Sequence, residues 1–252
     1  VTQLQRDLST HSVLLSIGKE NLYVWEKRPG ILHEDEAAAL LYKAAAGKNI
    51  HGTEPKEGKI ELKAACDGVF LVDSARLVAV NSQDEVMIAT RKGGTAVREG
   101  DKLAGMRVIP LIIEEEKLRK AEQAAGDKPL LSLKPYVRKT ACIVATGGEV
   151  KKGLIKDTFT PVVIDKLKTY GIETLEVVYS GDGVENVRDA VLAMREKKPD
   201  MILCTGGMSV DPDDTTPSAI KQTGAEVVSY GAPVLPGAMF LLAYTKDGKP
   251  IM

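Results

Sequence analysis

The second half of the chain alternates short apolar runs with amphipathic segments, and this alternation constrains the fold more than any other feature. Apolar runs of strand length lie at 141–146, 174–179 and 201–205, and segments with helical periodicity lie between them at 157–170 and 184–196. Strands that alternate with helices of this length form a parallel sheet with right-handed crossovers. We therefore predict an α/β domain built on a mostly parallel sheet.

The third of these runs leads into a glycine turn and an acidic loop. Gly206 and Gly207 permit positive φ and a close approach of the backbone to a ligand, and Thr216 and Pro217 suit the start of a helix. Such a turn offers free amides and a helix dipole to an anion. An Mg²⁺ ion that carries phosphate would account for nearby carboxylates, but a solvated Asp-rich turn explains the same residues. The loop holds three carboxylates, Asp211, Asp213 and Asp214.

Small or acidic residues follow each of the three predicted strands. They occur at 146–149 (TGGE), 180–183 (SGDG) and 205–207 (TGG). Ligands of parallel sheets bind beyond the carboxyl ends of the strands, so we expect a ligand site where these turns meet. The turns contain neither a Walker A loop nor the Gly-x-Gly-x-x-Gly fingerprint.

The first half of the chain has a different pattern, which predicts a separate β-rich α+β domain. Helix composition occurs at 33–46 and 114–125, and short β-branched runs at 69–72, 77–80 and 86–90 predict strands between them. Gly and Pro residues after position 125 indicate a linker. The predicted boundaries are 1–126 for the N-terminal domain, 127–137 for the linker and 138–252 for the α/β domain.

The last residues predict further elements of the α/β domain. The stretch 235–244 is typical of a turn that leads into a helix, and 250–252 has the composition of a strand start. Because a parallel strand should be followed by a turn at the ligand edge, we expect the C-terminal end of this domain to be incomplete.

Composition and charge limit the kinds of molecule that this protein could bind. The 252 residues carry a net charge of −1, which gives no electrostatic bias toward nucleic acid or an anionic membrane. No apolar run approaches the roughly 20 residues of a membrane span. The three cysteines fit no metal spacing, and neither do His33 and His51. These features predict a cytoplasmic protein that binds small molecules.

The stretch from Thr205 to Pro217 (TGGMSVDPDDTTP) resembles the signature of the molybdopterin-binding domain of molybdenum-cofactor biosynthesis. This domain occurs in molybdopterin adenylyltransferases, molybdopterin molybdotransferases and gephyrin. Three further stretches follow the order of the family, Thr146 to Val150 (TGGEV), Gly153 to Asp157 (GLIKD) and Leu235 to Met239 (LPGAM). The resemblance covers about residues 138–252 and implies a three-layer α/β/α fold.

The resemblance also implies a set of site residues. Asp214 and Asp182 match the acidic residues that assist catalysis or hold Mg²⁺. Other positions match the loops that receive the pterin phosphate or the nucleotide, namely Thr146, Gly147, Gly148, Glu149, Asp157, Thr205, Gly206, Gly207, Met208, Ser209, Pro236 and Gly237. Two positions depart from the molybdotransferase pattern. Gly148 replaces an Asp, which removes a possible metal or molybdate ligand, and Thr158-Phe159 replaces a Ser-Asn pair.

The activity that the resemblance implies is transfer of molybdate to adenylylated molybdopterin with Mg²⁺, and AMP leaves as molybdate enters. One alternative is a carrier or sensor that binds molybdopterin without turnover. A second is a molybdopterin adenylyltransferase that uses ATP. A third is a nucleotide hydrolase, because a related fold occurs in ADP-ribose and nicotinamide-nucleotide hydrolases. The family resemblance further implies a homo-oligomer.

Overall fold

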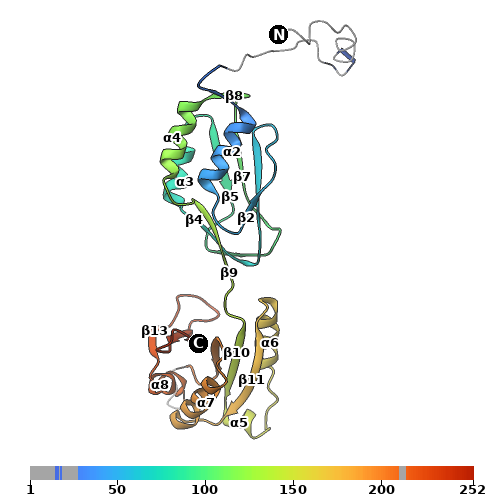
Figure 1. The fold of residues 1–252 in the computed structure, drawn as a ribbon. Helices are drawn as coiled ribbons and strands as arrows, with labels where there is room; N and C mark the ends of the chain where they lie inside the picture. Colours follow the sequence, from blue (N-terminus) through green and yellow to red (C-terminus); the bar gives the residue numbers. More distant parts are fainter. Residues whose placement is uncertain (1–14, 17, 19–27, 210–213) are drawn as a thin grey trace. The chain divides into compact units, whose positions relative to one another are not determined.

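The computed structural model describes residues 15, 16, 18, 28–209 and 214–252, and it divides into two compact units at Pro135 and Tyr136 (Figure 1). Each unit has its own buried core. Among the described residues, no helix has both the length and the apolar character needed to cross a bilayer.

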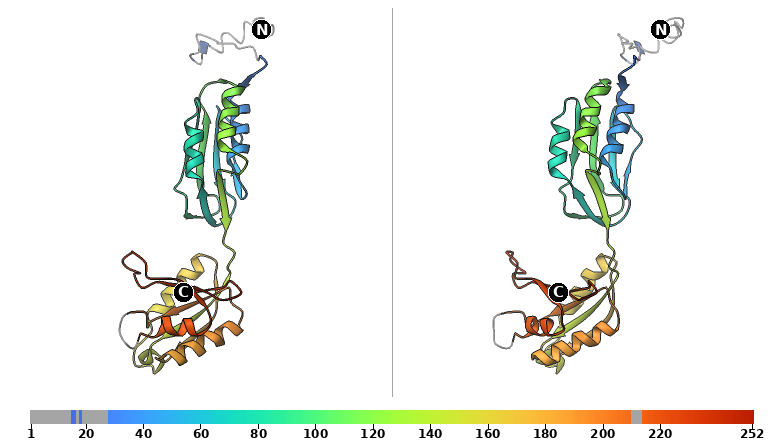
Figure 2. Two further views of the ribbon diagram at one scale, coloured as in Figure 1. Left: turned by 90° about the vertical axis from the view of Figure 1, so that its left-hand side faces the viewer. Right: turned by 60° about the vertical axis from the view of Figure 1, so that its left-hand side comes forward.

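The first unit combines antiparallel strands with three helices, as the α+β prediction stated. The helices lie side by side in the order α3, α4, α2 (Figure 2). Their bounds are α2 (Glu34–Ala45), α3 (Ser74–Asn81) and α4 (Glu115–Ala125). One sheet has four strands in the order β2 (Ile50–Gly52), β3 (Lys59–Ala64), β7 (Lys102–Val108) and β5 (Val86–Thr90). A second sheet has three strands in the order β6 (Thr95–Val97), β4 (Gly68–Val72) and β9 (Leu131–Pro135). A two-stranded sheet pairs β1 (Ile31–His33) with β8 (Ile112–Glu114).

Helix α2 confirms the prediction for 33–46 and gives His33 a structural role. The His33 ring nitrogen Nδ1 accepts a hydrogen bond from the Asp35 N–H at 3.2 Å, and the Glu36 carboxylate accepts one from the His33 N–H at 3.1 Å. Two N–H groups that have no partner within the helix are thereby satisfied, as in a capping box. His33 therefore starts a helix, and no metal is needed to explain it.

Two predictions for the first unit are wrong. Residues 77–80 belong to helix α3, which the Asp73 carboxylate caps by accepting from the Arg76 N–H at 3.1 Å. The β-branched composition of this short run suggested a strand. Residues 131–135 of the predicted linker form strand β9, which pairs with β4. Leu131 and Leu133 are buried in the core, whereas the prolines at 129 and 135 had suggested an irregular segment.

The second unit is a three-layer α/β/α domain. Its sheet has six strands in the order β11 (Glu173–Ser180), β10 (Thr140–Thr146), β12 (Met201–Thr205), β15 (Pro250–Ile251), β14 (Leu241–Tyr244) and β13 (Glu226–Tyr230). The first four are parallel, and β14 is antiparallel to both of its neighbours. Its helices are α5 (Gly148–Lys151), α6 (Phe159–Thr169), α7 (Val184–Glu196) and α8 (Thr216–Gln222).

The helices cover opposite faces of this sheet (Figure 2). Leu167 of α6 packs with Ala141 and Ile143 on one face. Alternate residues of β10, Cys142 and Val144, pack against α7 and α8 on the other face. Successive side chains of a strand point to opposite faces of the sheet. Because helices cover both faces, the side chains of β10 are buried on both sides.

The predicted helix near 235–244 is wrong, and the strand predicted from 250 is confirmed as β15. Residues 231–240 form a loop closed by backbone hydrogen bonds from Gly231 to Phe240 and from Ala232 to Ala238, both 2.8 Å. Leu241 and Ala243 then enter the core from strand β14. The apolar run at 239–243 is compatible with either element by composition.

Candidate functional site at the carboxyl edge of the sheet

Sheet register brings the ends of β10, β11 and β12 together. Thr146 pairs with Ser180, and Ala145 pairs with Thr205. The Thr146 hydroxyl donates to the Thr205 carbonyl at 2.9 Å, and the Gly147 N–H donates to the Ser180 carbonyl at 3.2 Å. The three turns that the sequence placed at strand ends therefore form one continuous surface at the carboxyl edge.

Gly206 and Gly207 are fixed by packing at this edge. Their φ angles are +87° and +61°, values that favour glycine. A Cβ atom at Gly206 would lie 2.6 Å from both the carbonyl and the hydroxyl oxygen of Thr146, and one at Gly207 would lie 2.6 Å from the Thr216 hydroxyl. That hydroxyl donates to the Gly206 carbonyl at 2.9 Å. Contacts within the protein thus explain both glycines without a ligand.

Asp182 closes the turn after β11 onto the turn after β10. Its Oδ1 and Oδ2 atoms both accept from the Gly148 N–H, at 3.1 and 3.0 Å. A Cβ atom at Gly148 would collide with Oδ2 of Asp182. A side chain at position 148 would therefore require the Asp182 carboxylate to move.

Asp157 joins the start of α6 to the end of β11. Its Oδ1 accepts from the N–H groups of Phe159 and Thr160, at 2.9 and 3.0 Å, and its Oδ2 accepts from the Tyr179 hydroxyl at 3.0 Å. Burial raises the pKa of this carboxyl, but the hydrogen bonds from Thr160, Phe159 and Tyr179 outweigh it and place the pKa below its usual value. The same hydrogen bond to Asp157 raises the pKa of the Tyr179 phenol.

Tyr179 is a site residue that the sequence did not single out. It lies one residue before Ser180, where the strand ends, and its side chain is exposed. A tyrosine in a strand is ordinary, and its partner Asp157 is 22 positions away. The pair forms only in the folded structure, where α6 packs against β11.

The remaining predicted residues lie around this edge at different depths. Asp214 is half-buried, two residues before α8, whereas Asp211 and Asp213 lie outside the described residues. The Met208 carbonyl accepts from the Tyr230 hydroxyl at 2.9 Å, which ties the turn after β12 to the end of β13. Ser209 and Glu149 are exposed.

Pro236 and Gly237 lie in the loop between β13 and β14, and both are exposed. Strand β13 runs parallel to β12 and ends at Tyr230, whose hydroxyl donates to the Met208 carbonyl, so this loop leaves the sheet at the carboxyl edge. Within the described part of the chain, no hydrogen bond joins either residue to the ends of β10, β11 or β12.

The described residues do not assemble a magnesium centre on their own. Both oxygens of Asp182 already accept a hydrogen bond, and the described part of the chain contains no cluster of three or more His, Cys, Asp or Glu side chains able to hold a metal. Magnesium is often bound by one or two carboxylates together with substrate phosphates. The described side chains alone therefore do not supply a full set of ligands for Mg²⁺.

Comparison with known proteins finds a family model that matches part of this unit. Residues 142–246 match the model of the probable molybdopterin binding domain. The match falls on the stretch in which the motifs predicted a resemblance to the molybdopterin-binding domain of molybdenum-cofactor biosynthesis.

Particular relatives fall into two groups. A molybdopterin molybdenumtransferase of Synechococcus elongatus is 22% identical over 187 residues, which cover 70% of this chain and 44% of that protein. A CinA-like protein of Petrotoga mobilis is 30% identical over 83 residues, covering 33% of this chain and 20% of that one. A CinA-like protein of Thermosipho melanesiensis is 34% identical over 95 residues, which cover 36% of this chain and 22% of that protein. The chain thus spans less than half the length of these curated relatives.

Two solved structures resemble part of this chain. A putative molybdenum cofactor biosynthesis protein from Corynebacterium diphtheriae has 14% identity and a TM-score of 0.39, covering 45% of this chain and 79% of that one. The CinA protein from Thermoplasma acidophilum has 16% identity and a TM-score of 0.40, covering 45% of this chain and 86% of that one.

Proposed function

We propose that the second unit binds molybdopterin at the carboxyl edge of its sheet, and that the protein transfers molybdate to adenylylated molybdopterin. The observation that supports this most is the junction of Thr146, Thr205 and Gly206 within a domain of the molybdopterin-binding family. In this proposal the backbone N–H groups of the turn from Gly206 to Ser209 bind the pterin phosphate. Fixed N–H dipoles stabilise an anion without having to reorganise.

The two acidic residues have different tasks in this proposal. Asp182 holds the Gly148 N–H and so positions the turn after β10. Asp214 is the candidate catalytic carboxylate because it is half-buried next to the start of α8. Magnesium enters only as the ion that nucleotide phosphates carry. Water cleaves the phosphoanhydride bond between AMP and the pterin phosphate, so AMP leaves and the phosphate is restored as molybdate enters.

A second function, binding of molybdopterin without turnover, is favoured by one observation. Position 148 lacks the carboxylate of the molybdotransferases, and Asp182 is engaged in a structural hydrogen bond. Such a site keeps the backbone groups that bind phosphate but has fewer groups for chemistry. The chain would then carry or sense the pterin.

The test measures pyrophosphate and AMP release by the chain. Molybdopterin with Mg-ATP is supplied first, and adenylylated molybdopterin with molybdate second. AMP release that depends on molybdate and is lost in Asp214→Asn, with molybdopterin binding retained, supports the proposal. Pyrophosphate release from ATP would instead indicate adenylyl transfer, and stoichiometric binding without either product would indicate a carrier. Hydrolysis of ADP-ribose, with no response to the pterin, would contradict all three.

A further inference from the structure

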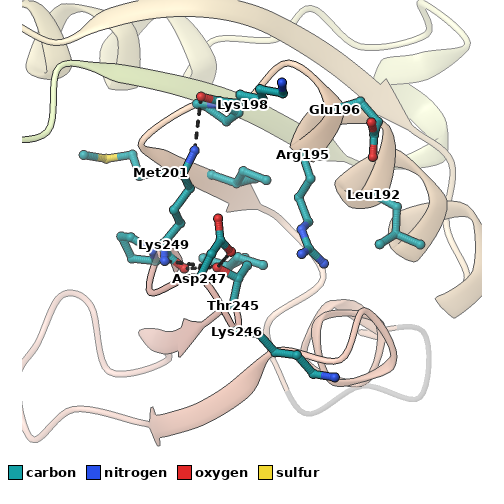
Figure 3. Close-up of a pocket in the computed structure, with 13 residues that line it drawn as sticks. Leu192, Arg195, Glu196, Lys198, Met201, Thr245, Lys246, Asp247 and Lys249 are labelled. Carbon is teal, nitrogen blue, oxygen red and sulfur yellow. Dashed lines mark hydrogen bonds between the residues drawn. The ribbon is translucent and has the colours of Figure 1, made fainter.

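A pocket of about 480 Å³ lies at the opposite edge of the second unit's sheet from the candidate site. It lies where β12 and β15 begin, between the C-terminal end of α7 and the turn that joins β14 to β15 (Figure 3). Met201 lines the pocket at the start of β12, whereas Thr205 belongs to the candidate site at its end. The pocket is therefore a separate site.

The wall of the pocket is partly apolar. Its volume falls in the range of small-molecule sites, which combine apolar walls with a few convergent polar groups. Apolar side chains reach it from α7, β12 and β15, namely Leu192, Met201, Ile202, Pro250 and Ile251. A ligand that fits this wall has an apolar body as well as a polar head group.

Positively charged side chains line the pocket from two elements, α7 and the turn between β14 and β15. Arg195 extends from α7 toward that turn, whereas the ends of Lys246 and Lys249 point away from each other (Figure 3). The Arg195 guanidinium donates to the Thr223 carbonyl at a long 3.4 Å, and the Lys249 ammonium donates to the Lys198 carbonyl at 3.2 Å. Over the residues that the structure describes, none of Arg195, Lys246 and Lys249 forms an ion pair.

Asp247, an acidic residue of the pocket, is held within its own turn. Its Oδ1 accepts from the Thr245 hydroxyl at 2.6 Å. This hydrogen bond, followed by one from the backbone and by the fields of Lys249 and Arg195, places the pKa of Asp247 below its usual value. The charged side chains that line the pocket are four cations and two carboxylates, namely Arg195, Lys198, Lys246, Lys249, Glu196 and Asp247. The pocket therefore has an excess of two positive charges, which favours an anionic ligand.

We propose that this pocket binds a small phosphate monoester, whose phosphate pairs with the Arg195 guanidinium in the field of Lys246 and Lys249, and whose apolar body packs on Leu192 and Met201. A phosphate monoester carries roughly −1.5 to −2 charges at neutral pH, which matches the excess. Its oxygens suit an arginine, because Arg pairs with phosphate through two parallel hydrogen bonds. This inference does not depend on the proposed function.

The test titrates phenyl phosphate into the isotope-labelled full chain and follows backbone amide signals by NMR. Shifts are expected at 195–199 and 245–251. Arg195→Gln should weaken binding about tenfold, because the phosphate loses its charge-assisted hydrogen bonds to the guanidinium. Lys197→Gln is the matched control. It removes one positive charge from the same helix end, but its ammonium pairs with Glu176 at 2.9 Å and does not line the pocket.

Three results would overturn the inference. The first is equal weakening by Lys197→Gln and Arg195→Gln, which would indicate a general charge effect. The second is equal affinity for benzoate, which has the same ring with a carboxylate. The third is the absence of shifts at 245–251. If Arg195→Gln alters the far-UV circular dichroism spectrum, Lys246→Gln replaces it with the same expected direction. The shifts that molybdopterin causes at the carboxyl edge should be unchanged in either variant.

Discussion

At the scale of single residues, the shape of the carboxyl edge depends on a few residues with specific contacts, such as Gly206 and Asp157. Gly206 combines a positive φ with a contact to Thr146 that leaves no room for Cβ. Asp157 satisfies two N–H groups of α6 and the Tyr179 hydroxyl with one carboxylate. Both residues shape the turns that the proposed ligand would contact.

Gly206→Ala should destabilise the second unit by about 2–4 kcal/mol, because strain at positive φ adds to the collision with Thr146. Gly224→Ala is the matched control. Its φ is +79°, and a Cβ atom there would meet nothing within 4 Å, so it should cost about 1 kcal/mol. Urea unfolding measures both changes. Equal losses in the two variants would show that the contact with Thr146 is unimportant.

Asp157→Ala should cost about 1 kcal/mol at neutral pH, the typical loss for a helix cap. Because the pKa of Asp157 is lowered in the folded state, its ionised form contributes stability that is complete above the ordinary value of 3.8 and is lost as the pH falls through the lowered folded value. The difference between variant and wild type should therefore shrink below about pH 4.

Urea midpoints measured between pH 3 and pH 7 test this dependence. Asp165→Ala is the control, because that carboxylate is exposed on α6 and pairs only with Lys168 at 3.4 Å. It should change stability by less than about 0.5 kcal/mol. A loss for Asp157→Ala that stays constant down to pH 3 would rule out a contribution from the ionised form.

At the scale of elements, strands with tertiary partners were the hardest to predict. The central strands β10 and β12 and helix α7 follow from periodicity, because continuous apolar runs and helical spacing are strong signals. Strand β9 was missed because its neighbours Pro129 and Pro135 are typical of linkers. Its pairing partner β4 is about sixty residues away, so the information that defines the strand is not local.

Leu131→Ala tests whether β9 belongs to the core of the first unit. Leu131 has no exposed surface, and its carbonyl accepts from the Gly47 N–H at 2.8 Å. Removal of a fully buried leucine side chain should cost about 2–5 kcal/mol. Lys134→Ala, an exposed position of the same strand, should change stability by less than about 0.5 kcal/mol. A linker would tolerate both substitutions in urea unfolding.

At the scale of the whole molecule, sequence patterns predicted two kinds of architecture with a linker at 127–137 between them, and the contacts of the structure divide at Pro135 and Tyr136. Alternation of strands and helices predicted the parallel sheet, and the register of that sheet brought Thr146, Ser180 and Thr205 together. The Asp182–Gly148 hydrogen bond and the Asp157–Tyr179 pair were not predictable, because they join loops whose approach depends on the completed sheet. Pro236 and Gly237 were predicted from the motif alone, and their part in the site stays a prediction.

We propose that the two units fold independently, because each has its own core and the contacts divide at Pro135 and Tyr136. Fragments 1–135 and 136–252 should each unfold cooperatively, with urea midpoints within experimental error of the corresponding transitions of the full chain. Circular dichroism and urea titration measure this. An unfolded fragment, or a midpoint that falls sharply on separation, would mean that the units stabilise each other.

The central claim is that molybdopterin binds at the carboxyl edge of the second unit, and amide mapping by NMR tests it most directly. Titration of molybdopterin into the isotope-labelled full chain should shift the signals of residues 146–148, 180–183 and 205–209, and these shifts should saturate together. Because molybdopterin carries a phosphate of the kind that the pocket is proposed to bind, the signals of residues 245–251 are followed separately. Shifts confined to those residues, or no saturable shift at the carboxyl edge, would contradict the account.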